Sequence, residues 1–157
     1  MPDGNPHLHL FLPLTTPEPE TAEGGLAILL TNKTGQATVK GMLLEAGSGA
    51  DTLVTLVAED DFDPIGVCHE AGIADGSDCW VVVSGIAEVY FELGATRHDF
   101  FRAPNSGAGG DGLNTGNAVA EAVPGSPAAT DKHFQEAGHV LETVAADNLA
   151  KCVLHFN

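Results

Sequence analysis

The feature that most constrains the fold is one pattern that occurs three times along the chain. It begins with Gly-x-x-x-Glu, continues through a short turn rich in small and acidic residues, and ends in an apolar strand. The three copies begin at Gly41, Gly66 and Gly138, and their second strands are expected at 53–58, 80–84 and 150–156. Each copy predicts a β-hairpin, and three hairpins in 157 residues predict an all-β fold, a compact β-barrel or sandwich.

The recurrence has a second interpretation, because hairpins of unrelated origin converge on similar patterns. The spacing between the copies is irregular, whereas a solenoid needs a fixed period. The motifs end in Glu45, Glu70 and Glu142. We interpret these residues as one structural role used three times, an acidic residue near a turn, rather than as a carboxylate pair for acid–base catalysis.

The segment 80–92 carries the strongest strand signal, because β-branched and aromatic residues alternate along it. The alternation predicts one apolar face that contains Val81, Val83, Ala87, Val89 and Phe91, and a second face, from Trp80 to Glu92, that becomes polar toward its end. Gly85 interrupts the segment and predicts a bend or bulge that curves a barrel. The expected core consists of Val54, Leu56, Ile65, Val67, Val81, Val83, Val89, Phe91, Val140, Cys152 and Leu154.

The remaining composition divides the chain into an arm and one domain. Residues 1–25 combine a short apolar stretch with a segment rich in Pro, Glu and Thr, and predict an extended N-terminal arm. Residues 26–157 form a single β-rich domain that starts with a strand at 26–30 and includes a long Gly/Pro-rich loop at 103–127. At most one short helix is expected, at 127–135.

The charge of the chain excludes several classes of partner. Six Lys and Arg stand against 22 Asp and Glu, a formal net charge of −16. A phosphate backbone or an anionic membrane surface needs clustered cations, so we expect neither nucleic acid nor a membrane as partner. The same acidity keeps a solvated protein soluble, and adaptation to high salt is an equally open explanation.

The side chains that could carry chemistry do not form a recognisable site in the sequence. The three cysteines (Cys68, Cys79 and Cys152) lack disulfide or zinc spacing, so we expect small core hydrophobes made in a reducing compartment. The seven histidines show no zinc pattern, and neither a nucleophile elbow nor a phosphate loop is present. We therefore predict no catalytic residue, metal or cofactor, and no enzymatic activity.

Two blocks of the sequence resemble the capsid decoration, or cement, proteins of tailed phages. The first is DPIGVCHEAGIADGSDCWVVVSGIAEV at 63–89. The second is HFQEAGHVLETVAA at 133–146 together with LAKCVLHFN at 149–157. The resemblance covers roughly residues 41–92 and 127–157.

The resemblance implies a function that rests on protein–protein contact. Such proteins bind the outer surface of the expanded shell, often as homotrimers, and clamp neighbouring major capsid subunits. This chain would then be made in the host cytoplasm and reside in the virion. Trp80 becomes a candidate interface residue. The expected capsid-binding anchors of the arm are Leu8, Leu10, Phe11, Leu12 and Leu14.

Two other functions remain open at this point. The first is a small-ligand or carbohydrate-binding β-barrel, which a virion could display, although aromatic residues make up only 6% of the chain. The second is a metal-dependent enzyme that uses histidines and the repeated glutamates. Stoichiometric metal in protein purified without an affinity tag would favour the second.

Overall fold

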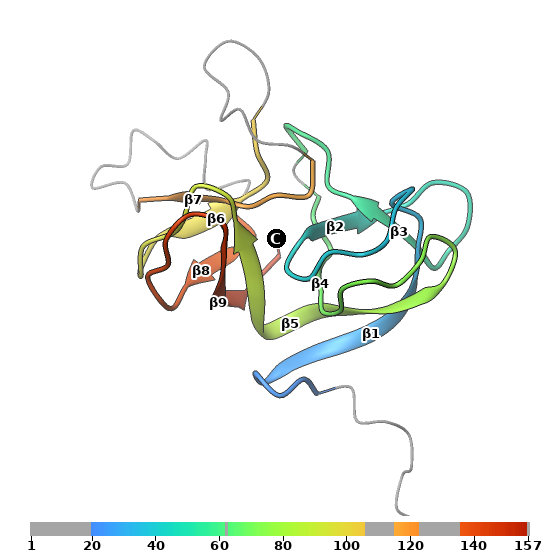
Figure 1. Cartoon of the computed structure of the whole chain (residues 1–157), viewed down its shortest axis with the longest axis horizontal. Helices are drawn as coiled ribbons and strands as arrows, with labels where there is room; N and C mark the ends of the chain where they lie inside the picture. The colour runs from blue at the N-terminus through green and yellow to red at the C-terminus, as the bar shows by residue number, and fades with distance from the viewer. Residues whose placement is uncertain (1–19, 62, 106–114, 123–135, 157) are drawn as a thin grey trace, which may run out of the picture.

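The computed structural model describes residues 20–61, 63–105, 115–122 and 136–156, and within these ranges the chain forms β-strands and their connections (Figure 1). The strands are β1 (Gly25–Asn32), β2 (Leu43–Ala46), β3 (Leu53–Leu56), β4 (Gly66–Cys68), β5 (Asp78–Phe91), β6 (Phe100–Arg102), β7 (Val119–Glu121), β8 (Gly138–Val140) and β9 (Asn148–Leu154). The all-β fold class predicted from the sequence is confirmed. This described part contains no helix with the length and apolar character of a membrane span.

All three predicted hairpins are present as antiparallel strand pairs. The first copy of the repeat forms β2 and β3, the second forms β4 and β5, and the third forms β8 and β9. The strands occur in the order β1-β3-β2-β4-β5-β9-β8-β6-β7. An additional pairing between β1 and β5 closes the first five strands into a small barrel.

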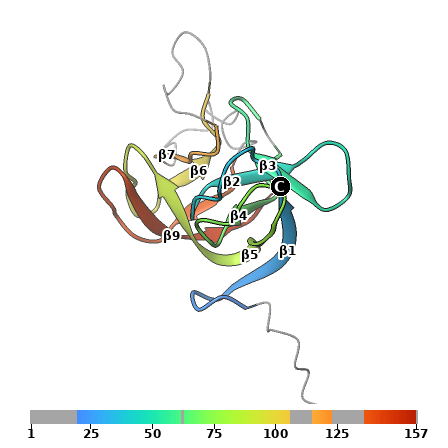
Figure 2. The same cartoon turned by 45° about the vertical axis from the view of Figure 1, so that its right-hand side comes forward.

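The long strand β5 joins the barrel to a second lobe. Its first half pairs with β1 and β4, and its second half pairs with β9, which carries β8, β6 and β7 beyond it. Figure 1 shows β5 running from the barrel lobe on the right to the lobe of β6–β9 on the left. In Figure 2 the turned view again places β1 away from β6 and β7, along the side of the barrel.

Two hydrophobic cores stabilise these lobes. The barrel core contains residues from β2 to β5, with Leu30 of β1 packed against it, and therefore fills the barrel interior. The shared core draws on both lobes and includes Leu43, Val82, Phe91, Phe101 and Leu154. Phe91 and Phe101 meet edge to face, with their ring centroids 5.9 Å apart, an arrangement that aromatic pairs favour.

The predicted core is largely correct, and all three cysteines are free and buried, as expected for small core hydrophobes. Eight of the eleven predicted core residues are buried, while Leu56, Ile65 and Val83 are half-buried against the barrel core. Val82 corrects the predicted face of β5. Its side chain is buried in the shared core, because both faces of β5 are covered within the barrel lobe.

Gly85 is the residue that allows β5 to serve both lobes. Before it, Val82 points to the shared core, whereas after it Ala87 and Val89 do so, and the side of the strand that faces this core therefore changes at Gly85. Gly85 has a φ of 79°, and the register of β1 against β5 shifts at the neighbouring residues Leu26 and Ala27. This shift leaves Val83 of β5 without a partner on β1, so the irregularity that the sequence predicted is present as a bulge at Val83, two residues before Gly85.

The predicted loop at 103–127 contains a strand that the sequence did not indicate. Residues 119–121 form β7, which pairs with β6, and Glu121 makes an ion pair with the buried guanidinium of Arg102. Small residues without alternation surround this strand, so its pairing depends on β6 rather than on local propensity. The possible helix at 127–135 lies outside the described residues.

Replacing Gly85 by alanine should destabilise the fold while leaving its topology unchanged. An added Cβ would lie 2.6 Å from the backbone oxygen of Gly24, and L-residues rarely adopt a φ of 79°. We expect G85A to lose at least about 2 kcal/mol in the free energy of unfolding, measured by urea denaturation. Gly35 has a similar φ and open space around it, so G35A is the matched control and should lose less. Equal losses in the two variants would contradict this account.

Candidate functional site

The repeated glutamates share one structural role, as the sequence predicted. In each hairpin the carboxylate accepts a hydrogen bond from a backbone N–H at or near the second strand. The three acceptor and donor pairs are Glu45 with Ala58 (3.2 Å), Glu70 with Trp80 (3.3 Å) and Glu142 with Lys151 (2.9 Å). Each glutamate therefore joins the two strands of its own hairpin. The three carboxylates lie in three separate places and do not form one site.

The glycines of the repeat are explained by close packing. A Cβ on Gly66 would lie 2.4 Å from a methyl group of Val81, and one on Gly138 would lie 2.1 Å from the backbone oxygen of Val153. Contacts this short do not occur, so larger residues would push the paired strands apart. In the second and third copies, the Gly-x-x-x-Glu motif thus combines a close approach of the paired strands with a carboxylate that holds the hairpin. In the first copy, Gly41 lies instead against Tyr90 of β5 and Leu149 of β9.

Glu45 is the glutamate of the repeat whose pKa is raised. Burial raises the pKa of the Glu45 carboxyl, and a hydrogen bond that the protonated carboxyl donates to Asp61, together with the negative charges of Asp61 and Asp63, acts in the same direction. A raised folded-state pKa stabilises the fold below the unfolded-state pKa, and this stabilisation is lost as the pH rises through the folded-state value. The shift reflects acidic neighbours in a connecting loop, which is a structural cause rather than a sign of catalysis.

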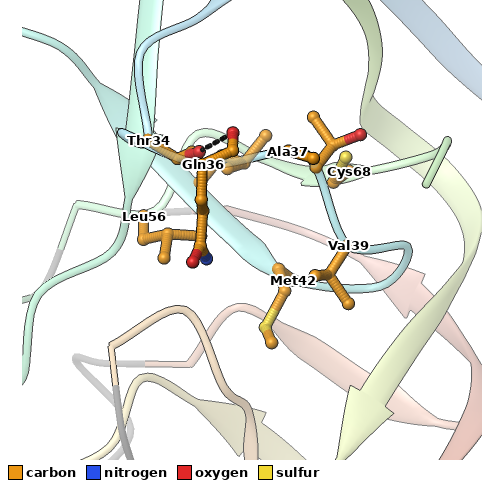
Figure 3. Close-up of a pocket in the computed structure, with 9 residues that line it drawn as sticks. Thr34, Gln36, Ala37, Val39, Met42, Leu56 and Cys68 are labelled. Atoms are coloured by element: carbon orange, nitrogen blue, oxygen red, sulfur yellow. Dashed lines mark hydrogen bonds between the residues drawn. The ribbon is translucent and has the colours of Figure 1, made fainter. Parts of the chain in front are cut away.

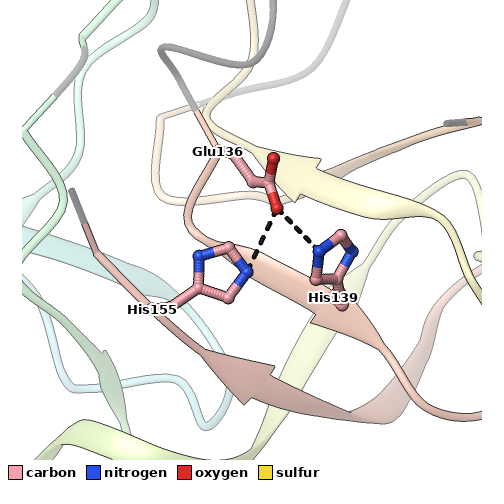
Figure 4. Close-up of side chains that lie close together, drawn as sticks. All are labelled: Glu136, His139 and His155. Carbon is pink, nitrogen blue, oxygen red and sulfur yellow. Dashed lines mark ion pairs between the residues drawn. The ribbon is translucent and has the colours of Figure 1, made fainter. Parts of the chain in front are cut away.

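A cluster of two histidines and a glutamate lies at β8 and at the end of β9, in the lobe opposite the barrel (Figure 4). His139 Nε2 lies 2.9 Å from Glu136 Oε1, and His155 Nε2 lies 3.1 Å from the same oxygen. The two imidazole rings are 4.9 Å apart between their centroids. Glu136 is buried, with 8% of its side chain exposed, whereas each histidine side chain is 41% exposed.

The pairing of β8 with β9 creates this cluster. His139 lies opposite Val153, so His155 lies one diagonal step away on the same face of the sheet, and the backbone N–H of His155 donates to the Ala137 oxygen. Glu136 comes immediately before β8. Sequence reasoning missed the cluster because zinc motifs are recognised by short spacing, and nineteen positions separate Glu136 from His155. Only the strand register could have revealed it.

The described barrel contains little internal space for a ligand. A cavity between the β1–β2 connection and strands β2, β3 and β4 is lined by Val39, Met42, Leu56, Cys68 and neighbouring residues (Figure 3). Its volume of about 10 Å³ accommodates roughly one water molecule. A sugar or a drug-sized ligand therefore does not fit in it.

A wider open groove of about 620 Å³ adjoins this cavity. Its lining is mostly polar and includes Gln36, Glu92 and Asn117, with Tyr90 as its one aromatic residue among those described. Asn117 donates a 2.6 Å hydrogen bond to the Glu92 carboxylate. A small ligand that binds in this groove would have a single aromatic ring, that of Tyr90, for stacking.

An apolar surface follows β1 on the outside of the barrel. Leu26 and Ile28 are exposed on one face of β1, and Leu29 is exposed on the other, where it lies opposite the half-buried Trp80 across the β1–β5 pair. On its other edge, β1 pairs with β3 only at its end, and with Glu20 at Leu26. Between these points, no partner strand among the described residues covers the edge. The predicted arm anchors at 8–14 lie outside the described residues.

Comparison with known proteins shows a similarity of fold. No family model matches the chain, and neither does any curated protein. The fold is similar to the crystal structure of the N base of the head fiber protein gp8.5 of bacteriophage phi29, with a TM-score of 0.56 and 14% sequence identity. The match covers 83% of this chain and 94% of the other. At this identity, the two chains share a fold.

The hairpin role of the glutamates predicts different effects of two substitutions at Glu142. Glu142→Ala removes the acceptor of the Lys151 N–H and should lower the free energy of unfolding by about 1 kcal/mol. Glu142→Gln keeps an acceptor oxygen at the same place and should lose clearly less. Thermal and urea unfolding of both variants would test this difference. Equal losses would show that the charge of Glu142, and not its hydrogen bond, stabilises the hairpin.

Proposed function

We propose that this chain is a structural protein of a tailed-phage head. In this proposal it decorates the outer surface of the capsid, binds the major capsid protein and stabilises contacts between its subunits. The observation that carries the proposal is the fold similarity to the N base of a phage head fiber, which extends over nearly the whole of both chains. The resemblance of residues 63–89 and 133–157 to decoration proteins points to the same role.

The apolar surface of β1 supports a role in protein–protein contact. Leu26, Ile28 and Leu29 are exposed on the two faces of one strand edge, and such edges accept an added strand from a partner. The N-terminal arm precedes this strand directly, so arm and edge could bind neighbouring capsid elements together. Two linked contacts that are weak alone give a high combined affinity through local concentration.

The charge of the chain supports the same role. A net charge of −16 keeps free copies apart before assembly and would be offset by cationic regions of the shell. We further propose that three copies assemble into a homotrimer on the shell, in line with the resemblance. Trp80 lies beside Leu29 and is the aromatic residue best placed to enter such an interface.

Co-sedimentation with expanded, undecorated shells of the parent phage tests the proposal. We expect saturable binding at a fixed ratio to the major capsid protein, and shells that survive more heat. A deletion of residues 1–19 preserves the pairing of Glu20 with Leu26, so it should retain the unfolding temperature and lose shell binding. If the intact chain does not bind well-formed shells, the proposal fails, and a small-ligand barrel that uses the groove beside Tyr90 becomes the better account.

A charged substitution on β1 tests the contact surface separately from the arm. Leu29→Asp places a carboxylate beside Trp80, on the most exposed of the three apolar side chains of β1, and should weaken shell binding at least about 10-fold, a loss of about 1.4 kcal/mol. Leu93→Asp is the matched control, since Leu93 is 65% exposed and lies at the end of β5, away from β1. Equal binding of the two variants would exclude the β1 surface as a contact.

A further inference from the structure

The cluster of Glu136, His139 and His155 combines the ligand types of a transition-metal site. Imidazole nitrogen and carboxylate oxygen are the donors that Zn²⁺ takes in proteins, often as two histidines and one carboxylate with a further position left to water. The ligand atoms of the three residues all lie within 4.8 Å of one another. The donor set is therefore complete for a three-ligand site.

Two of the three distances between the ligand atoms fit a metal site, and the third lies within 4.8 Å. Bonds of 2.0–2.1 Å to one ion place neighbouring ligand atoms about 3 Å apart. The two Nε2 to Oε1 distances are 2.9 and 3.1 Å. Figure 4 shows both imidazoles turned toward the same carboxylate oxygen, so that an ion could be taken up between the three side chains after small side-chain movements.

The surroundings allow an ion to enter and favour its charge. Both histidine side chains are 41% exposed, whereas Glu136 is held at the bottom of the cluster with 8% of its side chain exposed. The histidines therefore leave a path for a hydrated cation and a coordination position for water. The net charge of −16 raises the local concentration of cations around the whole molecule.

We propose that Glu136, His139 and His155 bind a divalent transition-metal cation of the Zn²⁺ type, which links β8 to the chain segment that follows β9. Without an ion, backbone hydrogen bonds such as that from His155 to Ala137 join these segments. The metal would add three coordinate bonds at the end of the last strand. This site is independent of capsid binding, so it stands or falls separately from the proposed function.

Zinc titration of the full chain, purified without an affinity tag and treated with a chelator, tests the proposal. We expect one Zn²⁺ per chain by calorimetry, and a higher unfolding temperature with zinc present. At a zinc concentration about 100 times the dissociation constant, the folding equilibrium should shift about 100-fold. Because protons compete for the same imidazole nitrogens, zinc affinity should weaken as the pH falls. Absence of binding at millimolar zinc would overturn the proposal.

Substitutions locate the ion. His139→Ala and His155→Ala should each weaken zinc binding by about 100-fold or more, since even the loss of residues that only orient a ligand costs 10- to 100-fold. Glu136→Gln keeps a hydrogen-bond acceptor for both histidines but loses the anionic ligand, so it should retain the metal-free stability and lose zinc affinity. His69→Ala, in the barrel lobe, is the matched control and should bind zinc like the unmodified chain.

A measurement on the unmodified chain covers the case in which a variant fails to fold. Zinc should shift the imidazole NMR signals of His139 and His155 together, at one equivalent, and leave those of His69 unchanged. Shifts of other histidines alone, or unchanged zinc affinity in all three cluster variants, would assign the metal to adventitious surface binding and overturn the proposal.

Discussion

The structure depends on the continuity of β5 through Gly85. This one strand contributes side chains to the barrel core before the glycine and to the shared core on both sides of it, and it pairs with strands of both lobes. A chain reversal at this point would separate the lobes, and a regular strand would turn Ala87 and Val89 away from the shared core. A side chain at this position would be strained by the φ of 79° and would collide with the backbone of Gly24, so the position requires glycine.

The repeated motif solves a related local problem three times. Each hairpin needs its strands close together and needs its N–H groups satisfied where the regular pairing stops. In the second and third copies glycine permits this close approach, whereas Gly41 of the first copy lies against Tyr90 and Leu149. In all three copies the glutamate four residues later supplies an acceptor for a backbone N–H of the opposite segment. The recurrence in the sequence therefore reflects physical requirements of short hairpins, which accounts for both its similarity and its irregular spacing.

A phage-head role and a metal site make different demands on this architecture. Capsid binding would use the outside of β1 and the arm, in the barrel lobe, where exposed leucines lie beside an open strand edge. The histidine cluster lies at β8 and at the end of β9, in the other lobe. Because β5 connects the two, a metal-stabilised second lobe would support the barrel mechanically without taking part in its contacts.

The sequence by itself determined the all-β class, the three hairpins, the bulge near Gly85 and most of the core, because these follow from local alternation and from glycine and glutamate at fixed positions. Tertiary structure decided what depends on long-range register. It buried Val82, formed β7 from a segment without strand propensity by pairing it with β6, and brought Glu136 to His155 across the β8–β9 pair. The tertiary structure also decided that β1 and β5 pair and close the barrel, since no local pattern encodes which distant strands become neighbours.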